Sequence, residues 1–230
     1  MLQPDAMLPE VPLRPAPWDL QGSAWIVALK LPPGDAAHDA FLPASLVGRG
    51  RGLASYLMFV DYRKSGCGPY RELLFIPGAF PFADGRRHLS ISRIVVSTWD
   101  SVVNGRNNWG IPKDRADFEV EYGTAQGRED RVRVSSDGRE LCELRFARSR
   151  FMPRLPVYGS WLPAGLRTLA QELRGRTYYY APSARGWIRP GRLESWRFDP
   201  ALFPDLSTAA VVATLAVESF ELTFPVAQVT

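Results

Sequence analysis

The 230-residue chain is poor in the side chains that hold metals and form disulfides. It has two cysteines, Cys67 and Cys142, and two histidines, His38 and His88. These are too few to build a structural zinc cluster, a disulfide framework or an iron–sulfur site. We therefore expect both thiols to be reduced, and we expect chemistry that needs no metal and no other cofactor.

Signals for export and for membrane insertion are also missing. The longest apolar run, residues 209–217, is interrupted by Thr214 and is far shorter than the roughly 20 residues that cross a bilayer. Residues 1–17 contain five prolines and no basic stretch leading into an apolar one, unlike a signal peptide. We expect a single cytoplasmic domain over residues 1–230 without membrane contact, in which residues 1–17 form a proline-rich N-terminal arm.

Lysine is scarce as well. Of the 28 basic residues 25 are arginine, and lysine occurs only at Lys30, Lys64 and Lys113. Ten arginines lie within residues 145–192 against one acidic residue, Glu172, with aromatic residues between them. Such a composition is found in grooves that bind nucleic acids, but no nucleic-acid-binding motif accompanies it. We favour arginines on solvated strand faces and at subunit contacts, and we expect no nucleic-acid partner.

Period-two alternation and short runs of β-branched or aromatic residues dominate the chain, with Gly, Pro and Asp turn signals between them. Arginine and valine alternate in residues 131–134, and Asp137-Gly138 is a strong hairpin signal. Strands are predicted at residues 24–31, 53–61, 71–76, 90–96, 116–121, 131–135, 140–146, 177–180, 194–198 and 215–224, and short helices at 35–41, 100–107 and 162–173. The pattern predicts a mainly β (α+β) fold, a closed antiparallel β-barrel or cone flanked by a few short helices.

The most unusual segment is residues 104–113. Its two glycines and one proline interrupt a helical stretch and place Lys113 directly after Pro112, next to Trp109 and Ile111. An amine held against apolar walls loses the hydration of its charged form, and the neutral amine is the nucleophile. On composition alone, the competing interpretation is an ordinary solvated lysine in a turn.

The run Gly105-Arg106-x-x-Trp109-Gly110-Ile111-Pro112-Lys113, preceded by Tyr70-Arg71-Glu72, resembles the acetoacetate decarboxylase family. The order of segments over roughly residues 15–125 is also similar. The resemblance implies an antiparallel β-barrel or cone, a homo-oligomer, and a lysine that forms a Schiff base with a β-keto acid. Carried over, Lys113 is the nucleophile and Glu72 the pocket carboxylate, and the remaining candidate pocket residues are Arg106, Trp109, Ile111, Tyr70, Leu57, Ser23 and Arg148.

The chain also departs from the family pattern. Asp114 stands where the decarboxylases have a second lysine, and Ser23 and Leu57 stand at the positions of a pocket arginine and a pocket glutamate. Neighbours in an extended backbone point to opposite faces, so Arg115 can lie closer to Lys113 than Asp114 does. Arg106 and Arg148 are candidates to bind a substrate carboxylate, although solvent at the end of the strand is the favoured partner of Arg148.

These features predict a Schiff-base-forming lyase that decarboxylates a small or medium β-keto acid through an imine on Lys113. One alternative is a Schiff-base aldolase or dehydratase acting on a 2-oxo acid through the same lysine. Another is a non-catalytic barrel that binds an apolar carbonyl ligand. A homo-oligomer is expected in each case.

Overall fold

The computed structural model describes residues 3–51, 54–123, 129–149, 152–159 and 167–230. The predicted mainly β fold is confirmed, with one α-helix among these residues, α1 (Trp99–Trp109). No helix in the described ranges is long and apolar enough to cross a bilayer. The strands are β1 (Trp18–Lys30), β2 (Ser55–Lys64), β3 (Tyr70–Ile76), β4 (Gly78–Pro81), β5 (Arg87–Ser90), β6 (Arg93–Val96), β7 (Lys113–Arg115), β8 (Asp117–Glu121), β9 (Asp130–Ser136), β10 (Arg139–Arg148), β11 (Leu155–Tyr158), β12 (Leu169–Leu173), β13 (Arg176–Tyr180), β14 (Ser183–Phe198), β15 (Ala210–Phe224) and β16 (Gln228–Val229).

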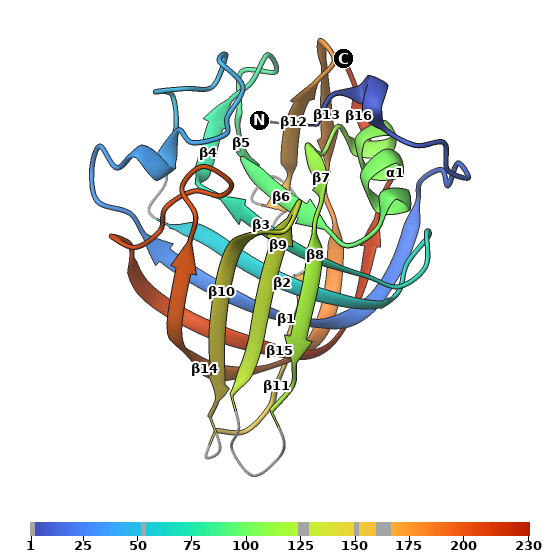
Figure 1. The fold of residues 1–230 in the computed structure, drawn as a ribbon. Helices are drawn as coiled ribbons and strands as arrows, with labels where there is room; N and C mark the ends of the chain where they lie inside the picture. The colour runs from blue at the N-terminus through green and yellow to red at the C-terminus, as the bar shows by residue number, and fades with distance from the viewer. Residues whose placement is uncertain (1–2, 52–53, 124–128, 150–151, 160–166) are drawn as a thin grey trace.

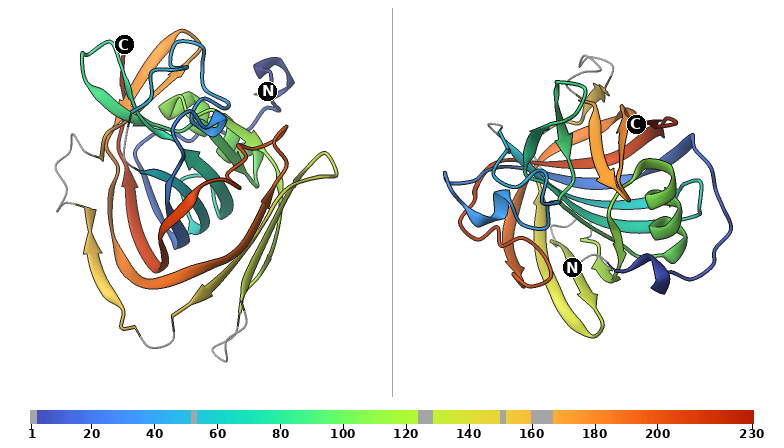
Figure 2. Two further views of the ribbon diagram at one scale, coloured as in Figure 1. Left: turned by 90° about the vertical axis from the view of Figure 1, so that its left-hand side faces the viewer. Right: turned by 90° about the horizontal axis from the view of Figure 1, so that it is seen from above.

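Eleven strands form one curled sheet in the order β7-β6-β3-β2-β1-β15-β14-β10-β9-β8, with β11 paired to β14. Figures 1 and 2 show how this sheet bends into a barrel-like shape, with α1 and the smaller sheet β16-β13-β12-β5-β4 gathered at one end. The two edge strands, β7 and β8, are separated in the chain by Ala116 alone. The sheet therefore nearly closes on itself at that point.

Side-chain alternation gives the sheet two apolar faces. On β2, Leu57 and Phe59 belong to a first core that also contains Val27, Phe75 and Phe146. The neighbouring side chains of the same strands point to the opposite face and form a second core, which includes Leu20, Val60, Leu74, Ile94 and Trp109. The candidate site lies on this second face, between the sheet, α1 and the smaller sheet.

The predicted helix at residues 100–107 is confirmed as α1, whereas two other helix predictions are wrong. Residues 35–41 contain only a short 3-10 turn, η2 (Ala36–His38). Residues 169–173 form β12, and the part of that prediction at residues 162–166 lies outside the described residues. Arg174 and Gly175 both adopt positive φ, which makes a tight hairpin turn from β12 to β13, and this pairing overrides the helical propensity of the segment.

The position of Leu57 in the first core has a measurable consequence. Its side chain is buried, so Leu57→Ala should lower the free energy of unfolding by about 2–5 kcal/mol through lost burial and a new cavity. Denaturant unfolding monitored by tryptophan fluorescence measures this loss. Val211→Ala, at a half-exposed position of β15, is the control and should stay within about 0.5 kcal/mol of the parent protein. A Leu57→Ala protein as stable as the parent would contradict the assignment.

Candidate active site

The turn after α1 delivers Lys113 to the sheet. The helix begins after Thr98, whose side chain accepts a hydrogen bond from the Ser101 amide, and ends at Gly110 in the left-handed region with φ 62°. A side chain at Gly110 would overlap the ring of Tyr178, with a Cβ only 2.3 Å from a ring carbon. Glycine at this position therefore satisfies both the backbone conformation and the close packing.

Gly105 explains another part of the motif. A Cβ at this helical position would lie 2.7 Å from Cδ of Lys113. The missing side chain leaves the space in which the lysine passes along the surface of α1. The glycine of the Gly-Arg pair in the sequence motif thus makes room for the aliphatic part of the Lys113 side chain.

The register of the strands decides which side chains share the lysine's face. Lys113 of β7 pairs with Ile94 of β6, and Ile94 pairs with Leu74 of β3. Two residues before Leu74 is Glu72, so alternation brings Glu72 onto the same face as Lys113. Tyr70 follows two residues further back on that strand.

The amine of Lys113 lies in a polar cluster enclosed by apolar walls. Its Nζ donates to Oε2 of Glu72 at 2.8 Å, to Oγ of Ser101 at 3.0 Å and to the hydroxyl of Tyr70 at 3.4 Å. It also lies 4.9 Å from the centre of the Tyr70 ring. Lys113 and Glu72 are 3% and 5% exposed, so the pair is almost completely removed from water. Contacts of this kind fix the position of the nitrogen to within a small region of the cavity.

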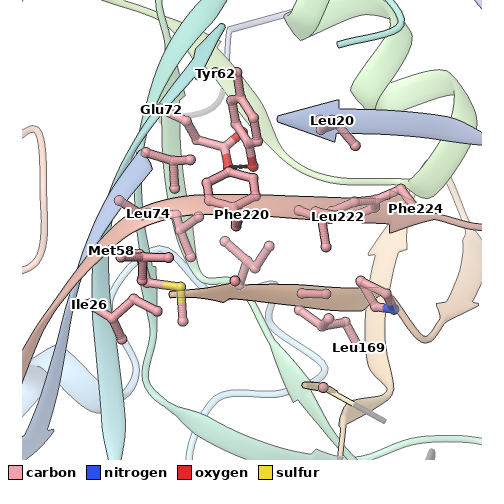
Figure 3. A pocket seen from close by; sticks show the side chains of 18 of the residues that line it. Leu20, Ile26, Met58, Tyr62, Glu72, Leu74, Leu169, Phe220, Leu222 and Phe224 are labelled. Carbon is pink, nitrogen blue, oxygen red and sulfur yellow. Dashed lines mark hydrogen bonds between the residues drawn. The ribbon is translucent and has the colours of Figure 1, made fainter. Parts of the chain in front are cut away.

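Two tyrosines complete the surroundings of the carboxylate. The hydroxyl of Tyr62 donates to Oε1 of Glu72 at 3.3 Å, as Figure 3 shows. Burial and the neighbouring Glu72 carboxylate raise the pKa of Tyr62 and the pKa of Tyr70 well above that of an ordinary tyrosine. Both phenols therefore keep their protons at neutral pH; Tyr62 donates to Glu72, and Tyr70 accepts from Lys113.

Asp114 faces away from Lys113, as the alternation of β7 predicts. Its carboxylate contacts Nη1 of Arg93, and it accepts hydrogen bonds from Nη2 of Arg106 at 2.9 Å and from the Gln3 amide at 2.8 Å. Arg115 pairs with Asp117 at the partly exposed edge of the protein. The acidic residue after the lysine thus belongs to a separate network on the other side of the strand.

Arg106 is a positioning residue, and its prediction as a pocket residue is wrong. Its side chain is fully buried, and its Nε donates to the backbone oxygen of Lys113 at 2.9 Å. The other nitrogens of the guanidinium bind Asp114 and, on the N-terminal arm, Asp5 and the Gln3 carbonyl. Arg106 thus binds the strand that carries the lysine through Nε and Nη2, and the N-terminal arm through Nη1.

A cavity of about 340 Å³ opens in front of the amine. Five of the predicted site residues line it together: Lys113, Glu72, Tyr70, Trp109 and Ile111. Apart from Lys113 and Glu72, the only charged residue described in its wall is Arg185, which is mostly exposed and donates to Glu221 at 2.8 Å. The other described lining residues are nearly all apolar, among them Leu20, Ile26, Met58, Leu74, Leu169, Phe220, Leu222 and Phe224 (Figure 3).

Two further pocket predictions are wrong because of strand parity. Leu57 lies in the first core, on the opposite face of β2 from Met58 and Val60. Ser23 does not line the cavity, which β1 reaches through Trp18, Leu20, Ala24 and Ile26. Alignment by sequence position does not determine on which face of a strand a side chain lies, and only one face of β1 and of β2 lines the cavity.

Arg148 does not line the cavity either, because an acidic residue of the protein holds its side chain elsewhere. Its guanidinium binds the buried carboxylate of Asp130 at 2.6 Å and lies 5.3 Å from the Trp25 ring, at the end of the first core. Solvent access at a strand end was the favoured expectation for Arg148, and its side chain is 37% exposed. The described contacts are thus structural and lie away from the cavity.

Sequence reasoning missed two polar residues of the site. Tyr62 pairs directly with Tyr70 across the β2–β3 hairpin, so the turn at residues 65–68 could have placed it. Ser101 lies twelve residues before Lys113 in the first turn of α1, and no sequence signal marks its contact with Nζ. Only the packing of α1 against β7 brings the two together.

Comparison with known proteins identifies the family of this chain. The family model for acetoacetate decarboxylase (ADC) matches residues 6–217. The chain belongs to the acetoacetate decarboxylase family. No match was found among curated protein sequences.

Solved structures of this family share the fold. Acetoacetate decarboxylase from Legionella pneumophila is 14% identical with a TM-score of 0.67, covering 98% of this chain and 92% of that one. An acetoacetate decarboxylase-like enzyme from Sphingomonas wittichii is 16% identical with a TM-score of 0.65, covering 94% and 93%. The enduracididine biosynthesis enzyme MppR is 20% identical with a TM-score of 0.65, covering 94% and 88%. Family and fold together support an enzyme with decarboxylase-like or related lyase activity.

The network behind Lys113 gives a prediction for stability. Asp114→Asn removes the negative charge between two buried guanidinium groups and should cost about 3–5 kcal/mol of the free energy of unfolding. Asp117→Asn is the matched control, since its ion pair with Arg115 is largely exposed and should contribute less than about 1 kcal/mol. Thermal and denaturant unfolding compare the three proteins. Equal stability of the two variants would show that the Arg93–Asp114–Arg106 network is unimportant.

Proposed function

We propose that this protein is a Schiff-base-forming lyase that decarboxylates a small or medium β-keto acid through an imine on Lys113. The observation that supports it most strongly is the position of the amine, buried 2.8 Å from the Glu72 carboxylate at the wall of an apolar cavity. A solvated turn lysine would have neither feature. No group other than the protein's own side chains is required for the reaction.

Imine formation uses the contacts of Nζ. Transfer of a proton from the ammonium to Glu72 over the 2.8 Å hydrogen bond produces a neutral amine, which attacks the ketone carbon of the substrate. The former carbonyl oxygen takes up one proton from the attacking nitrogen to give the carbinolamine, and with a second proton it leaves as water, which gives the iminium ion. Glu72 is the proton donor for this loss of water, and the Tyr62 hydroxyl supports its carboxylate.

Loss of carbon dioxide follows from the charge of the iminium. The bond between the substrate's α-carbon and its carboxylate breaks, and the electron pair moves toward the positive nitrogen to give a neutral enamine. Because the surrounding wall is apolar, a step that removes a buried carboxylate and a buried cation together is favoured. The enamine carbon then takes up a proton, and water hydrolyses the imine to release the ketone and the free amine.

A second candidate function is aldol or dehydration chemistry on a 2-oxo acid through the same imine. The observation in its favour is the relative MppR, which has been solved with pyruvate and with the condensation product of pyruvate and imidazole 4-carboxaldehyde. Both reactions pass through an enamine, and the electrophile that meets this enamine distinguishes them. A barrel that only binds an apolar carbonyl ligand is the non-catalytic alternative.

We also propose that the protein is a homo-oligomer in the cytoplasm. Cys67 and Cys142 are both free thiols, which suits a reducing compartment. Light scattering of the purified protein measures the oligomeric state, and a monomer would contradict the first part of the proposal.

Trapping tests the imine directly. Incubation with acetone or pyruvate followed by borohydride should add the reduced ketone to Lys113, located by peptide mapping, and Lys113→Arg should remove the adduct. Lys64→Arg, at an exposed strand end, is the control and should leave trapping unchanged. If no carbonyl compound of such a panel modifies Lys113 in the folded protein, the proposal fails. Carbon dioxide release from a β-keto acid, measured in parallel, separates decarboxylation from aldol chemistry.

Glu72 has its own test. Glu72→Gln keeps the shape of the side chain and one of its two acceptor oxygens but removes proton transfer, so kcat should fall by about 100-fold or more. Ser101→Ala removes a hydrogen bond from Nζ without removing a proton carrier, and its effect on kcat should be clearly smaller. A Glu72→Gln enzyme with the parent rate would exclude the carboxylate from the proton-transfer steps.

A further inference from the structure

The cavity is much larger than the ketone of acetoacetate requires. An apolar protein cavity of about 150 Å³ holds a benzene molecule, and the cavity here is about 340 Å³. Acetoacetate carries a single methyl group on its ketone carbon. The volume beyond the amine therefore accommodates a substituent of about six to twelve carbons.

The extra volume is lined by a continuous row of apolar side chains on three neighbouring strands. Cross-strand pairing connects Leu74 of β3 to Met58 of β2, and Met58 to Ile26 of β1. All three line the cavity, and the first of them lies two residues from Glu72 on the same face. These three side chains form an apolar strip along one wall of the cavity. Because adjacent strands are about 4.8 Å apart, the strip extends about 10 Å from β3, the strand that carries Glu72, to β1.

The rest of the described wall is equally apolar. Phe220, Leu222 and Phe224 of β15, the strand next to β1 in the sheet, line the cavity, as does Leu169 of β12 (Figure 3). These side chains are only partly buried, although they belong to the second core. Phe220 packs against Tyr62 and Phe224 packs against Trp109, and their remaining apolar surface lines the cavity. Such surface gains contacts when an apolar group fills the cavity.

The two buried charges of the described wall lie together at one end of the cavity. Lys113 and Glu72 lie beside Tyr62 and Tyr70, and the strip from Leu74 to Ile26 carries no charged side chain. Arg185, the other charged residue of the described wall, is mostly exposed and is paired with Glu221. A substrate with a polar or charged tail would leave that tail without partners along the strip, at a cost in free energy. The geometry thus separates a reacting end from a hydrocarbon end.

Building on the proposed function, we infer that the substrate is a β-keto acid whose ketone carries an apolar chain or aryl group of about six carbons or more, bound along Leu74, Met58 and Ile26. Its ketone carbon lies at Nζ of Lys113, and its hydrocarbon part extends across β2 toward β1. Each methylene that enters the strip should improve affinity about fourfold until the cavity is full.

Product ketones test this chain-length rule without the instability of β-keto acids. Acetone, 2-pentanone, 2-heptanone and 2-nonanone form the same imine with Lys113, and borohydride reduces it to a stable amine. The ketone concentration that gives half-maximal trapping on Lys113 should fall at least tenfold from acetone to 2-heptanone. If all four ketones modify Lys113 at the same half-maximal concentration, this inference is wrong and the proposed function still holds. If no ketone modifies Lys113, the proposed function itself is refuted.

A variant in the strip locates the chain. Ile26→Trp fills the far end of the cavity and should reduce the preference for 2-nonanone over acetone by tenfold or more. Val212→Trp introduces the same ring at an exposed position of β15 outside the cavity and should leave the preference unchanged. An unchanged preference in a folded Ile26→Trp protein would place the chain elsewhere. Far-ultraviolet circular dichroism checks the fold, and if Ile26→Trp does not fold, the wild-type ketone series decides the inference.

Discussion

The hydrogen bond between Lys113 and Glu72 is the interaction on which the site depends. Two opposite charges lie almost completely out of water, which is costly unless each is paired and further hydrogen-bonded. Ser101, Tyr70 and Tyr62 supply those additional contacts. The same pairing keeps a proton carrier next to the only amine in the cavity wall described by the structure.

Several parts of the fold serve to hold this pair. Gly105 leaves room for the lysine stem, Gly110 turns the chain, and Arg106 holds the carbonyl of Lys113 from behind. The N-terminal arm takes part, because Gln3 and Asp5 bind the Arg106–Asp114 network. Strand β7 thus separates two environments, an apolar cavity in front with the Lys113 amine and an ion network behind it.

The sequence allowed the fold class, the position of α1 and five of the cavity residues to be predicted. Lys113, Glu72, Tyr70, Trp109 and Ile111 lie in local motifs whose spacing is readable along the chain. Residues that only tertiary packing brings to the site are harder to predict from the sequence. Ser101 reaches the amine only through packing of α1 against β7, and no local signal marks such a contact.

The errors have specific physical causes. Leu57 and Ser23 were assigned by position in an alignment, yet the face on which a strand residue lies changes with each step along the strand. Arg106 and Arg148 are candidates from the sequence to bind a substrate carboxylate, with solvent favoured for Arg148, and both are paired with acidic residues of the protein, Asp114 and Asp130. Helical propensity favoured a helix over residues 169–173, but pairing with β13 decides the structure there.

The central claim is that Lys113 presents a reactive amine to an apolar cavity. A crystal structure of the protein after borohydride reduction with 2-heptanone tests it most directly. We expect continuous electron density from Nζ of Lys113 to a branched carbon, with the alkyl chain lying along Leu74 and Met58 toward Ile26. An unmodified Lys113 with an empty cavity, or a ketone attached to a different lysine, would contradict it.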